Sequence, residues 1–235
     1  MRNITIILIL CFISTSFTIP GQFKRDISEA IEVLKKEQKT IDQISSKYDC
    51  EKVEVLSIVF PEVIRYSRFR DFFETKVLEQ LYVLKGNSWA DFSIGIFQMK
   101  PSFVEDLEYH VLNMPELNAD FQEIVNYDVI GEESKRFERI ERLKSVEWQL
   151  KYAFCYYYII QKCYEGYRFK SDEARLRFFA TAYNFGFTKS FAEIESWMNK
   201  KAFPYGEKFA ADQFAFCDLS TAFYKEHYIH FTKTP

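Results

Sequence analysis

The chain of 235 residues has few of the residues that interrupt regular structure, with 7 glycines and 6 prolines. It contains no glycine- or serine-rich tract, no internal repeat and no low-complexity segment, so we expect no flexible linker between separate domains. Aromatic residues are abundant instead, with 25 phenylalanines and 15 tyrosines. This composition predicts a densely packed globule with few long loops rather than a disordered chain.

An excess of basic charge and clusters of cysteine and histidine are also lacking. The 31 lysines and arginines face 34 aspartates and glutamates, for a net charge of −3 at pH 7. No basic stripe is available for a phosphate backbone, so we expect no nucleic-acid partner. The three histidines are scattered and no cysteines have CxxC spacing. The sequence therefore predicts no metal site and no cofactor.

Residues 1–20 have the pattern of a secretory signal peptide. Arg2 supplies the positive start and Ile4 to Phe17 the apolar core, followed by small residues near a cleavage point. This predicts export to the periplasm or the cell envelope. The alternative is an uncleaved membrane anchor, which the short apolar core disfavours. Cys11 leaves a lipid anchor open, although Leu10 stands where a lipoprotein signal has a small residue.

Four cysteines remain after residue 20, and the sequence leaves their pairing open. Cys155 and Cys163 are eight residues apart in a helical run, so about 12 Å along the axis separates them, too far for a disulfide. Any disulfide must therefore involve Cys50 or Cys217. The alternative is that all four are buried thiols that act as small apolar residues.

Periodic apolar residues predict helices along most of the chain. The expected ranges are 27–48, 53–60, 72–84, 103–112, 138–164, 173–183, 191–198 and 209–228, with one or two short helices in the polar stretch 113–134. The first helix either packs on the main domain or links it to a membrane. Residues 152–160 are almost wholly aromatic or aliphatic, which predicts the central core helix. We expect Asp172 to cap the helix that follows it.

The helix that begins after Asp49 delivers a carboxylate. Its residues from Val53 to Phe60 are apolar nearly all round, which indicates a buried helix. Pro61 lacks an amide donor and should kink or end the helix, which would leave Glu62 at the mouth of a groove. A carboxyl group in apolar surroundings can keep its proton near neutral pH and act as a general acid. The alternative is a glutamate that lies on the surface or in an ion pair.

The stretch from Ser93 to Ser102 indicates a tight loop followed by a helix. Gly95 allows a positive φ or a close approach of another backbone. Gln98 can both donate and accept hydrogen bonds, and Pro101 suits the first turn of a helix. Such a loop could line a groove that binds polar rings, or it could be an ordinary packed loop.

Three motifs occur in a fixed order: an apolar helix ending in Glu62, Ser-x-Gly-x-x-Gln-x-x-Pro at residues 93–101, and Ala-Tyr-Asn-x-Gly at residues 182–186. In this order they resemble the lytic transglycosylase (SLT-type) family of the lysozyme-like superfamily, which cuts bacterial peptidoglycan. The resemblance spans about residues 49–187. It implies a mainly α, goose-type lysozyme-like domain with a substrate groove over residues 49–235, preceded by an N-terminal helical lead at 21–48.

The resemblance also implies a mechanism. Glu62 takes the role of the single catalytic residue, which protonates the leaving oxygen of the MurNAc–GlcNAc bond and then draws the proton from the sugar's own 6-hydroxyl. An anhydro-muropeptide forms without water. The substrate-binding positions implied by the resemblance are Ser93, Gly95, Phe97, Gln98, Tyr183 and Asn184. Its partners are peptidoglycan glycan strands, with other envelope proteins open as partners, and the oligomeric state is not set by the sequence.

The chain departs from the family in two respects. Val63 stands where the family usually has a serine after the glutamate, and the interval from Glu62 to Gly95 is longer than usual. Two alternatives therefore stay open. A lysozyme-type hydrolase would need a second carboxylate about 5–9.5 Å from the acid, for which Asp91 is the candidate. A non-catalytic secreted protein would instead bind glycans or an envelope protein. Without the other motifs, Tyr183 could equally be a core aromatic residue, and Asn184 could be an ordinary residue at a helix end.

Overall fold

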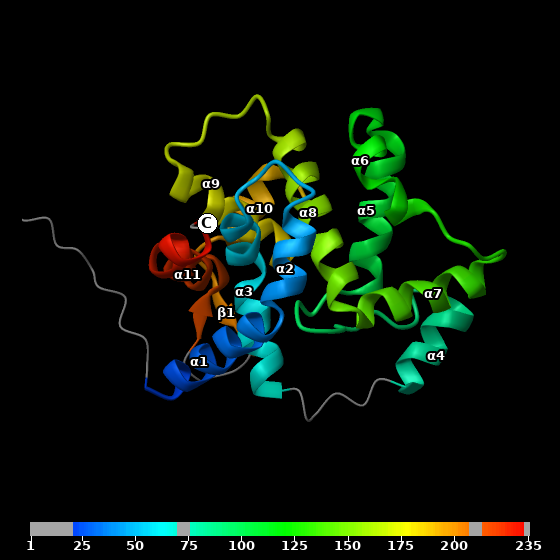
Figure 1. Cartoon of the computed structure of the whole chain (residues 1–235), viewed down its shortest axis with the longest axis horizontal. Helices are drawn as coiled ribbons and strands as arrows, with labels where there is room; N and C mark the ends of the chain where they lie inside the picture. The colour runs from blue at the N-terminus through cyan, green and yellow to red at the C-terminus, as the bar shows by residue number, and fades with distance from the viewer. Residues whose placement is uncertain (1–20, 70–75, 207–212, 233–235) are drawn as a thin grey trace, which may run out of the picture.

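A computed structural model describes residues 21–69, 76–206 and 213–232. The protein is mainly helical (Figure 1), as the sequence predicts. The signal peptide expected at residues 1–20 lies outside the described residues. Within the described ranges, no helix is both long enough and apolar enough to cross a membrane.

Helix α3 (Lys52–Phe69) is the centre of one side of the protein. Helices α1 (Gly21–Lys36), α9 (Asp172–Phe185) and α11 (Phe216–Thr232) pack against it. Its apolar residues from Val53 to Ile64 are almost completely buried, as their pattern predicts. The packing of α1 on α3 agrees with the interpretation of the first helix as a packed element.

Of the two outcomes expected at Pro61, a kink or an end of the helix, the end is wrong, because α3 continues through Pro61 to Phe69. A proline inside a helix costs about 3 kcal/mol. Val59, Phe60, Val63 and Ile64 flank it and are each at most 2% exposed. Burying each of these side chains contributes about 1.5–3 kcal/mol, so tertiary packing outweighs the cost of the proline.

Helix α8 (Val146–Cys163) lies between two groups of helices (Figure 1). Helices α3 and α9 contact it on one side, and α5 (Pro101–Asn113), α6 (Pro115–Val125) and α7 (Glu132–Lys144) contact it on the other. Nearly all of its side chains between Gln149 and Ile160 are buried, which confirms the expected core helix.

The remaining elements pack around this frame. Helix α2 (Gln38–Ser45) contacts α8, α4 (Lys76–Lys85) contacts α7, and α10 (Phe191–Trp197) contacts α9. Strands β1 (Lys201–Phe203) and β2 (Phe214–Ala215) form a small antiparallel pair next to α11.

Several predicted boundaries differ from the structure. The helix expected over 138–164 is divided at Ser145, whose backbone is extended and whose side chain accepts a hydrogen bond from the Trp148 amide at the start of α8. The helix expected over 27–48 is divided at Glu37 into α1 and α2. Ser171, not Asp172, caps α9 by accepting a hydrogen bond from the Ala174 amide at 3.1 Å.

The four cysteines at positions 50, 155, 163 and 217 are all free thiols. Cys155 and Cys217 are buried, as expected of small apolar residues. Cys50 is half-buried and Cys163 is exposed, so the expectation of four buried thiols is wrong for these two. Helix α8 ends at Cys163, where its packed surface ends as well.

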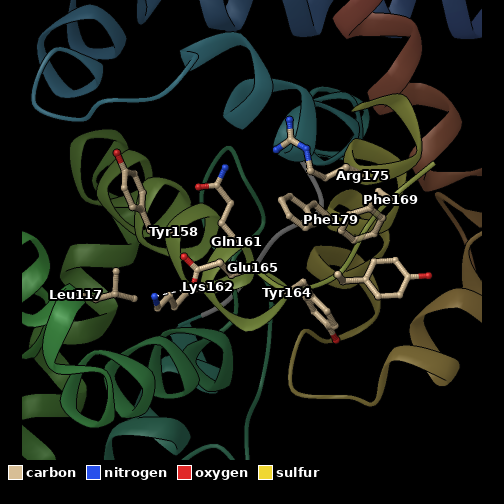
Figure 2. Close-up of a pocket in the computed structure, with 10 residues that line it drawn as sticks. Leu117, Tyr158, Gln161, Lys162, Tyr164, Glu165, Phe169, Arg175 and Phe179 are labelled. Carbon is tan, nitrogen blue, oxygen red and sulfur yellow. Dashed lines mark hydrogen bonds and ion pairs between the residues drawn. The ribbon is translucent and has the colours of Figure 1, made fainter. Parts of the chain in front are cut away.

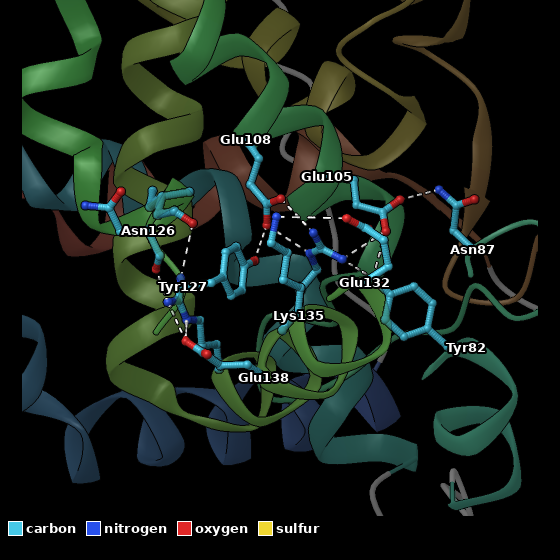
Figure 3. Close-up of polar contacts among 12 residues, drawn as sticks. Tyr82, Asn87, Glu105, Glu108, Asn126, Tyr127, Glu132, Lys135 and Glu138 are labelled. Atoms are coloured by element: carbon cyan, nitrogen blue, oxygen red, sulfur yellow. Dashed lines mark hydrogen bonds and ion pairs between the residues drawn. The ribbon is translucent and has the colours of Figure 1, made fainter. Parts of the chain in front are cut away.

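A buried arginine joins the elements on the far side of α8. The Arg139 guanidinium, on α7, lies 2.7 Å from a Glu108 oxygen and 3.0 Å from a Glu105 oxygen, both on α5. It also donates to the hydroxyl of Tyr82 on α4, and Tyr127 donates to Glu108. Figure 3 shows these side chains converging between the helices. This cluster ties α4, α5 and α7 together.

Candidate active site

Glu62 lies inside α3 and not after its end, because the helix continues through Pro61. Only 5% of the residue is exposed. Its Oε2 atom is 3.5 Å from Nη1 of Arg65, one turn later on the same helix, and a third of the Arg65 side chain still reaches solvent. Glu62 therefore combines both environments that the sequence left open, since it is buried among apolar residues and has an ion-pair partner at the edge.

These surroundings change the acidity of Glu62. Burial disfavours the charged carboxylate and raises the pKa of Glu62 to about 7, and the positive charges of Arg65 and Lys100 oppose that rise. At neutral pH the residue is therefore divided between the protonated and the ionised form. A group with this balance can both give and take a proton.

The loop from Ile94 to Met99 is held by its own backbone. The Ile94 amide donates to the Met99 carbonyl at 2.9 Å, and the Met99 amide donates back at 3.1 Å. Between them, Gly95 has a φ of +71° and Gln98 a φ of +50°. The positive φ expected at Gly95 is confirmed. Gln98 adopts a conformation that is uncommon for a residue with a side chain, at a cost of about 1–3 kcal/mol.

Gln149 on α8 anchors this loop. Its Oε1 atom accepts a hydrogen bond from the Phe97 amide at 2.8 Å, and its Nε2 atom donates to the Leu143 carbonyl at 2.6 Å. A Cβ atom on Gly95 would lie 1.5 Å from that Nε2 atom. The close approach that the glycine permits is therefore made by a side chain and not by another backbone.

Tyr183 connects the loop with Glu62. Its hydroxyl donates to the Phe97 carbonyl at 2.8 Å. Burial raises the pKa of Tyr183, and the negative charge of Glu62 raises it further, because the two groups are close. The ring packs edge-on against Phe103 and Tyr156, so it is held rigidly. The structure thus brings the glutamate, the loop and the Ala-Tyr-Asn motif together.

Gln98 presents an unused hydrogen-bond acceptor. Its Nε2 atom donates to the Gly95 carbonyl at 2.7 Å, whereas its buried Oε1 atom has no hydrogen-bond partner among the described residues. An unsatisfied buried acceptor costs about 1–3 kcal/mol. A native structure usually compensates such a group with water or with a ligand.

The other predicted site residues have different surroundings. Asp91 accepts hydrogen bonds from the amide and the hydroxyl of Ser102 at 3.1 and 2.8 Å, so both of its oxygens are engaged at the start of α5. The Phe97 side chain is fully buried, and the backbone carbonyl of Phe97 accepts the hydrogen bond from the Tyr183 hydroxyl. Ser93 is half-buried, and Asn184 is exposed at the end of α9.

The sequence did not indicate Gln149 or Lys100 as residues near the site. The available signal for Gln149 was an amide next to the aromatic and aliphatic run 152–160, since such a group needs a specific partner when buried. No comparable signal marks Lys100, whose place depends on how the loop folds onto α3. No group of three potential ligand side chains that could hold a metal ion occurs in the described part of the chain.

Comparison with known proteins does not identify the chain: no protein-family model matches it, and neither the curated proteins nor the solved structures contain a match.

Proposed function

We propose that the chain is an exported peptidoglycan lytic transglycosylase with a lysozyme-like domain over residues 49–235. One observation carries the proposal: Glu62 is buried, has a pKa of about 7, and is near enough for its charge to raise the pKa of Tyr183, whose hydroxyl is bonded to the 94–99 loop. The three motifs that resemble the family are far apart in the sequence. The hydrogen bond from Tyr183 to Phe97 and the effect of the Glu62 charge on Tyr183 support the resemblance.

The proposed reaction needs one group that changes roles. Protonated Glu62 gives its proton to the glycosidic oxygen as the bond to the anomeric carbon of MurNAc breaks. The resulting carboxylate takes the proton of the 6-hydroxyl, and the hydroxyl oxygen bonds to the anomeric carbon. Arg65, at 3.5 Å, stabilises the carboxylate between the two steps. The proton count of Glu62 is restored without water.

Three further observations bear on the choice between transglycosylation and the alternatives. Both oxygens of Asp91 are engaged by Ser102, which disfavours its use as the second carboxylate of a hydrolase. Val63, which departs from the family pattern, is completely buried. The Val63 side chain therefore packs in the core and offers no hydrogen bond to a ligand. The unsatisfied Oε1 atom of Gln98 can accept a hydrogen bond from a sugar hydroxyl or an acetamido N–H.

Mass spectrometry of the fragments released from purified peptidoglycan tests the proposal. We expect products one water lighter than reducing-end muropeptides from the wild type and from Asp91→Asn, and none from Glu62→Gln. Glu132→Gln, at an exposed glutamate, is the matched control and should keep full activity. Reducing-end products would instead mean a hydrolase. Binding to peptidoglycan without any cleavage would mean a non-catalytic protein.

A further inference from the structure

A concave site lies against α9 at Arg175 and Phe179, which precede Tyr183 along the helix. It is a pocket of about 390 Å³ between α6, α8, α9 and the segment that joins α8 to α9 (Figure 2). Small-molecule sites have volumes of about 300–1,000 Å³, so the pocket is large enough for a ligand. Its wall is formed mainly by tyrosine and phenylalanine side chains, interrupted by one amide and a few charged groups.

The charges in the wall are already paired. Lys162 lies 2.7 Å from Glu165, and both belong to the pocket. The Arg175 guanidinium lies 2.9 Å from one carboxylate oxygen of Glu54. The other oxygen of Glu54 accepts a hydrogen bond from the Tyr157 hydroxyl at 2.5 Å. Each positive group therefore has a negative partner. The pocket offers polar contacts without net charge, which disfavours both anionic and cationic ligands.

Uncharged hydrogen-bonding groups are available in the same wall. The Gln161 amide and the hydroxyls of Tyr164 and Tyr167 make no hydrogen bond to any residue that the structure describes. Figure 2 shows Gln161 between Tyr158 and Phe179, with Arg175 on the same side of the pocket. An amide can donate and accept at once, and a phenol can do the same.

The aromatic wall is rigid. The Tyr167 ring is 46% exposed and packs on Phe169 and Phe191, with centroid distances of 4.7 and 4.5 Å. A rigid, partly exposed ring gives a contact surface at low entropic cost. The C–H face of a pyranose ring is apolar and its rim is hydroxylated, so it matches an aromatic wall with neutral hydrogen-bonding groups at its edge.

We infer that this pocket is a second carbohydrate site, which binds an uncharged stretch of N-acetylhexosamine glycan apart from the place where Glu62 acts. The identification of the glycan as peptidoglycan depends on the proposed function, whereas the match to a neutral sugar depends on the pocket alone. Arg175 hydrogen-bonds Glu54, which precedes Glu62 by eight residues, or about 12 Å, along α3. Along α9, the pocket residues Arg175 and Phe179 precede Tyr183 by eight and four residues, or about 12 and 6 Å along the axis.

A second site of this kind keeps the glycan polymer bound while Glu62 acts on another part of the same polymer. Binding at the pocket would keep neighbouring glycan near Glu62 at a high effective concentration, without a new contact at the cleaved bond. Substitutions in the pocket should therefore weaken retention on peptidoglycan and leave the chemical identity of the released products unchanged.

Isothermal titration calorimetry with chitotetraose tests the inference in the Glu62→Gln background. Gln161→Ala and Tyr167→Ala should each remove one binding event or weaken it about tenfold, the effect of losing a contact worth about 1.4 kcal/mol. Phe137→Ala, at an aromatic residue that is 58% exposed on α7, is the matched control. Tetragalacturonate, an acidic probe, should bind much more weakly than chitotetraose. Thermal unfolding of each variant checks that the fold is kept.

The outcomes separate this inference from the proposed function. Pocket-dependent binding of chitotetraose without any cleavage of peptidoglycan by the wild type would support the second site and refute the transglycosylase. Cleavage with unchanged binding in both pocket variants would refute the second site alone. Failure of the parent Glu62→Gln protein to bind chitotetraose, or preferential binding of the acidic probe, would overturn the inference as well.

Discussion

Glu62 and Glu54 are both buried carboxylates on α3, and their partners distinguish their roles. Glu54 accepts a hydrogen bond from Tyr157 at 2.5 Å and pairs with Arg175 at 2.9 Å, so both oxygens have close partners. Among the residues that the structure describes, Glu62 has one ion-pair partner, Arg65, at 3.5 Å. Burial raises the pKa of both carboxyl groups, and at Glu54 the close contacts with Tyr157 and Arg175 oppose that rise and engage both oxygens. Glu62 is therefore suited to proton transfer and Glu54 to structure.

The raised pKa of Glu62 makes stability depend on pH. Its pKa rises from an ordinary value of 4.5 to about 7 on folding. Between these values the unfolded chain loses its proton first, so the free energy of unfolding falls as pH rises, by about 3 kcal/mol in total. We expect Glu62→Gln, which has no proton to lose, to equal the wild type at pH 4 and to be more stable by about that amount at pH 8. Urea unfolding at both pH values measures this, and a constant difference would contradict it.

Arg65 adjusts the acidity of Glu62, because its positive charge lowers the pKa that burial raises. We expect Arg65→Met to move the alkaline limb of the pH dependence of peptidoglycan cleavage to higher pH. Arg25→Met, which removes an exposed arginine paired with Glu29 at 3.2 Å, is the matched control and should leave the limb in place. A limb that stays in place or moves to lower pH in Arg65→Met would show that the pair does not control the acid.

At the scale of elements, the 94–99 loop depends on the amide of Gln149 and on the space left by Gly95. We expect Gly95→Ala to destabilise the protein by about 2–4 kcal/mol. It adds strain at a φ of +71° and displaces Gln149, which leaves the Phe97 amide without its acceptor.

Gly131→Ala is the control for this prediction. Gly131 also has a positive φ, of +94°, but a Cβ atom there would meet nothing within 4 Å. Its substitution should cost only the backbone strain, about 1 kcal/mol. Urea unfolding of the two variants measures the difference, and equal losses would mean that the contact with Gln149 is unimportant.

Local patterns predicted much of this arrangement. The apolar run around Phe60 predicted a buried helix, the aromatic run of α8 predicted the core, and Gly95 predicted a positive φ. Patterns of this kind depend on neighbouring residues, which the sequence shows directly. The sequence left the burial of Glu62 open, and its place inside α3 was not predicted.

The missed features depend on contacts between distant segments. Pro61 has a strong local tendency to end a helix, and the packing of α1, α9 and α11 on α3 overrides it. Ser145 divides a stretch whose apolar period appears continuous, because its side chain caps α8. The bond from Phe97 to Gln149 joins residues 52 positions apart, so no local pattern could indicate it.

At the scale of the whole molecule, the candidate site lies where the two groups of helices meet. The 94–99 loop is bonded to Gln149 on α8 and to Tyr183 on α9, and Glu62 reaches the same place from α3. The site therefore requires the helices on both sides of α8 to be correctly assembled. On the side of α5 and α7, that assembly depends on the Arg139 cluster (Figure 3).

Removal of this arginine should loosen that side of the protein. Arg139→Met leaves the Glu108 carboxylate, whose side chain is 13% exposed, without its cation. Breaking a buried ion pair in this way costs about 3–5 kcal/mol. Arg139→Lys keeps the charge but not the branched geometry and should lose less. Thermal unfolding measures both, and a loss under about 1 kcal/mol in Arg139→Met would show that the cluster adds little.

The central claim is that Glu62 holds a proton near neutral pH, and its carboxyl pKa can be measured directly. A ¹³C-detected NMR titration of the side-chain carboxyl carbons, with Glu62→Gln to assign the resonance, gives that value. The account predicts a midpoint close to 7, well above the ordinary value of 4.5. A midpoint at or below 4.5 would mean that Arg65 keeps Glu62 ionised, and the residue could not serve as the acid that the proposed function requires.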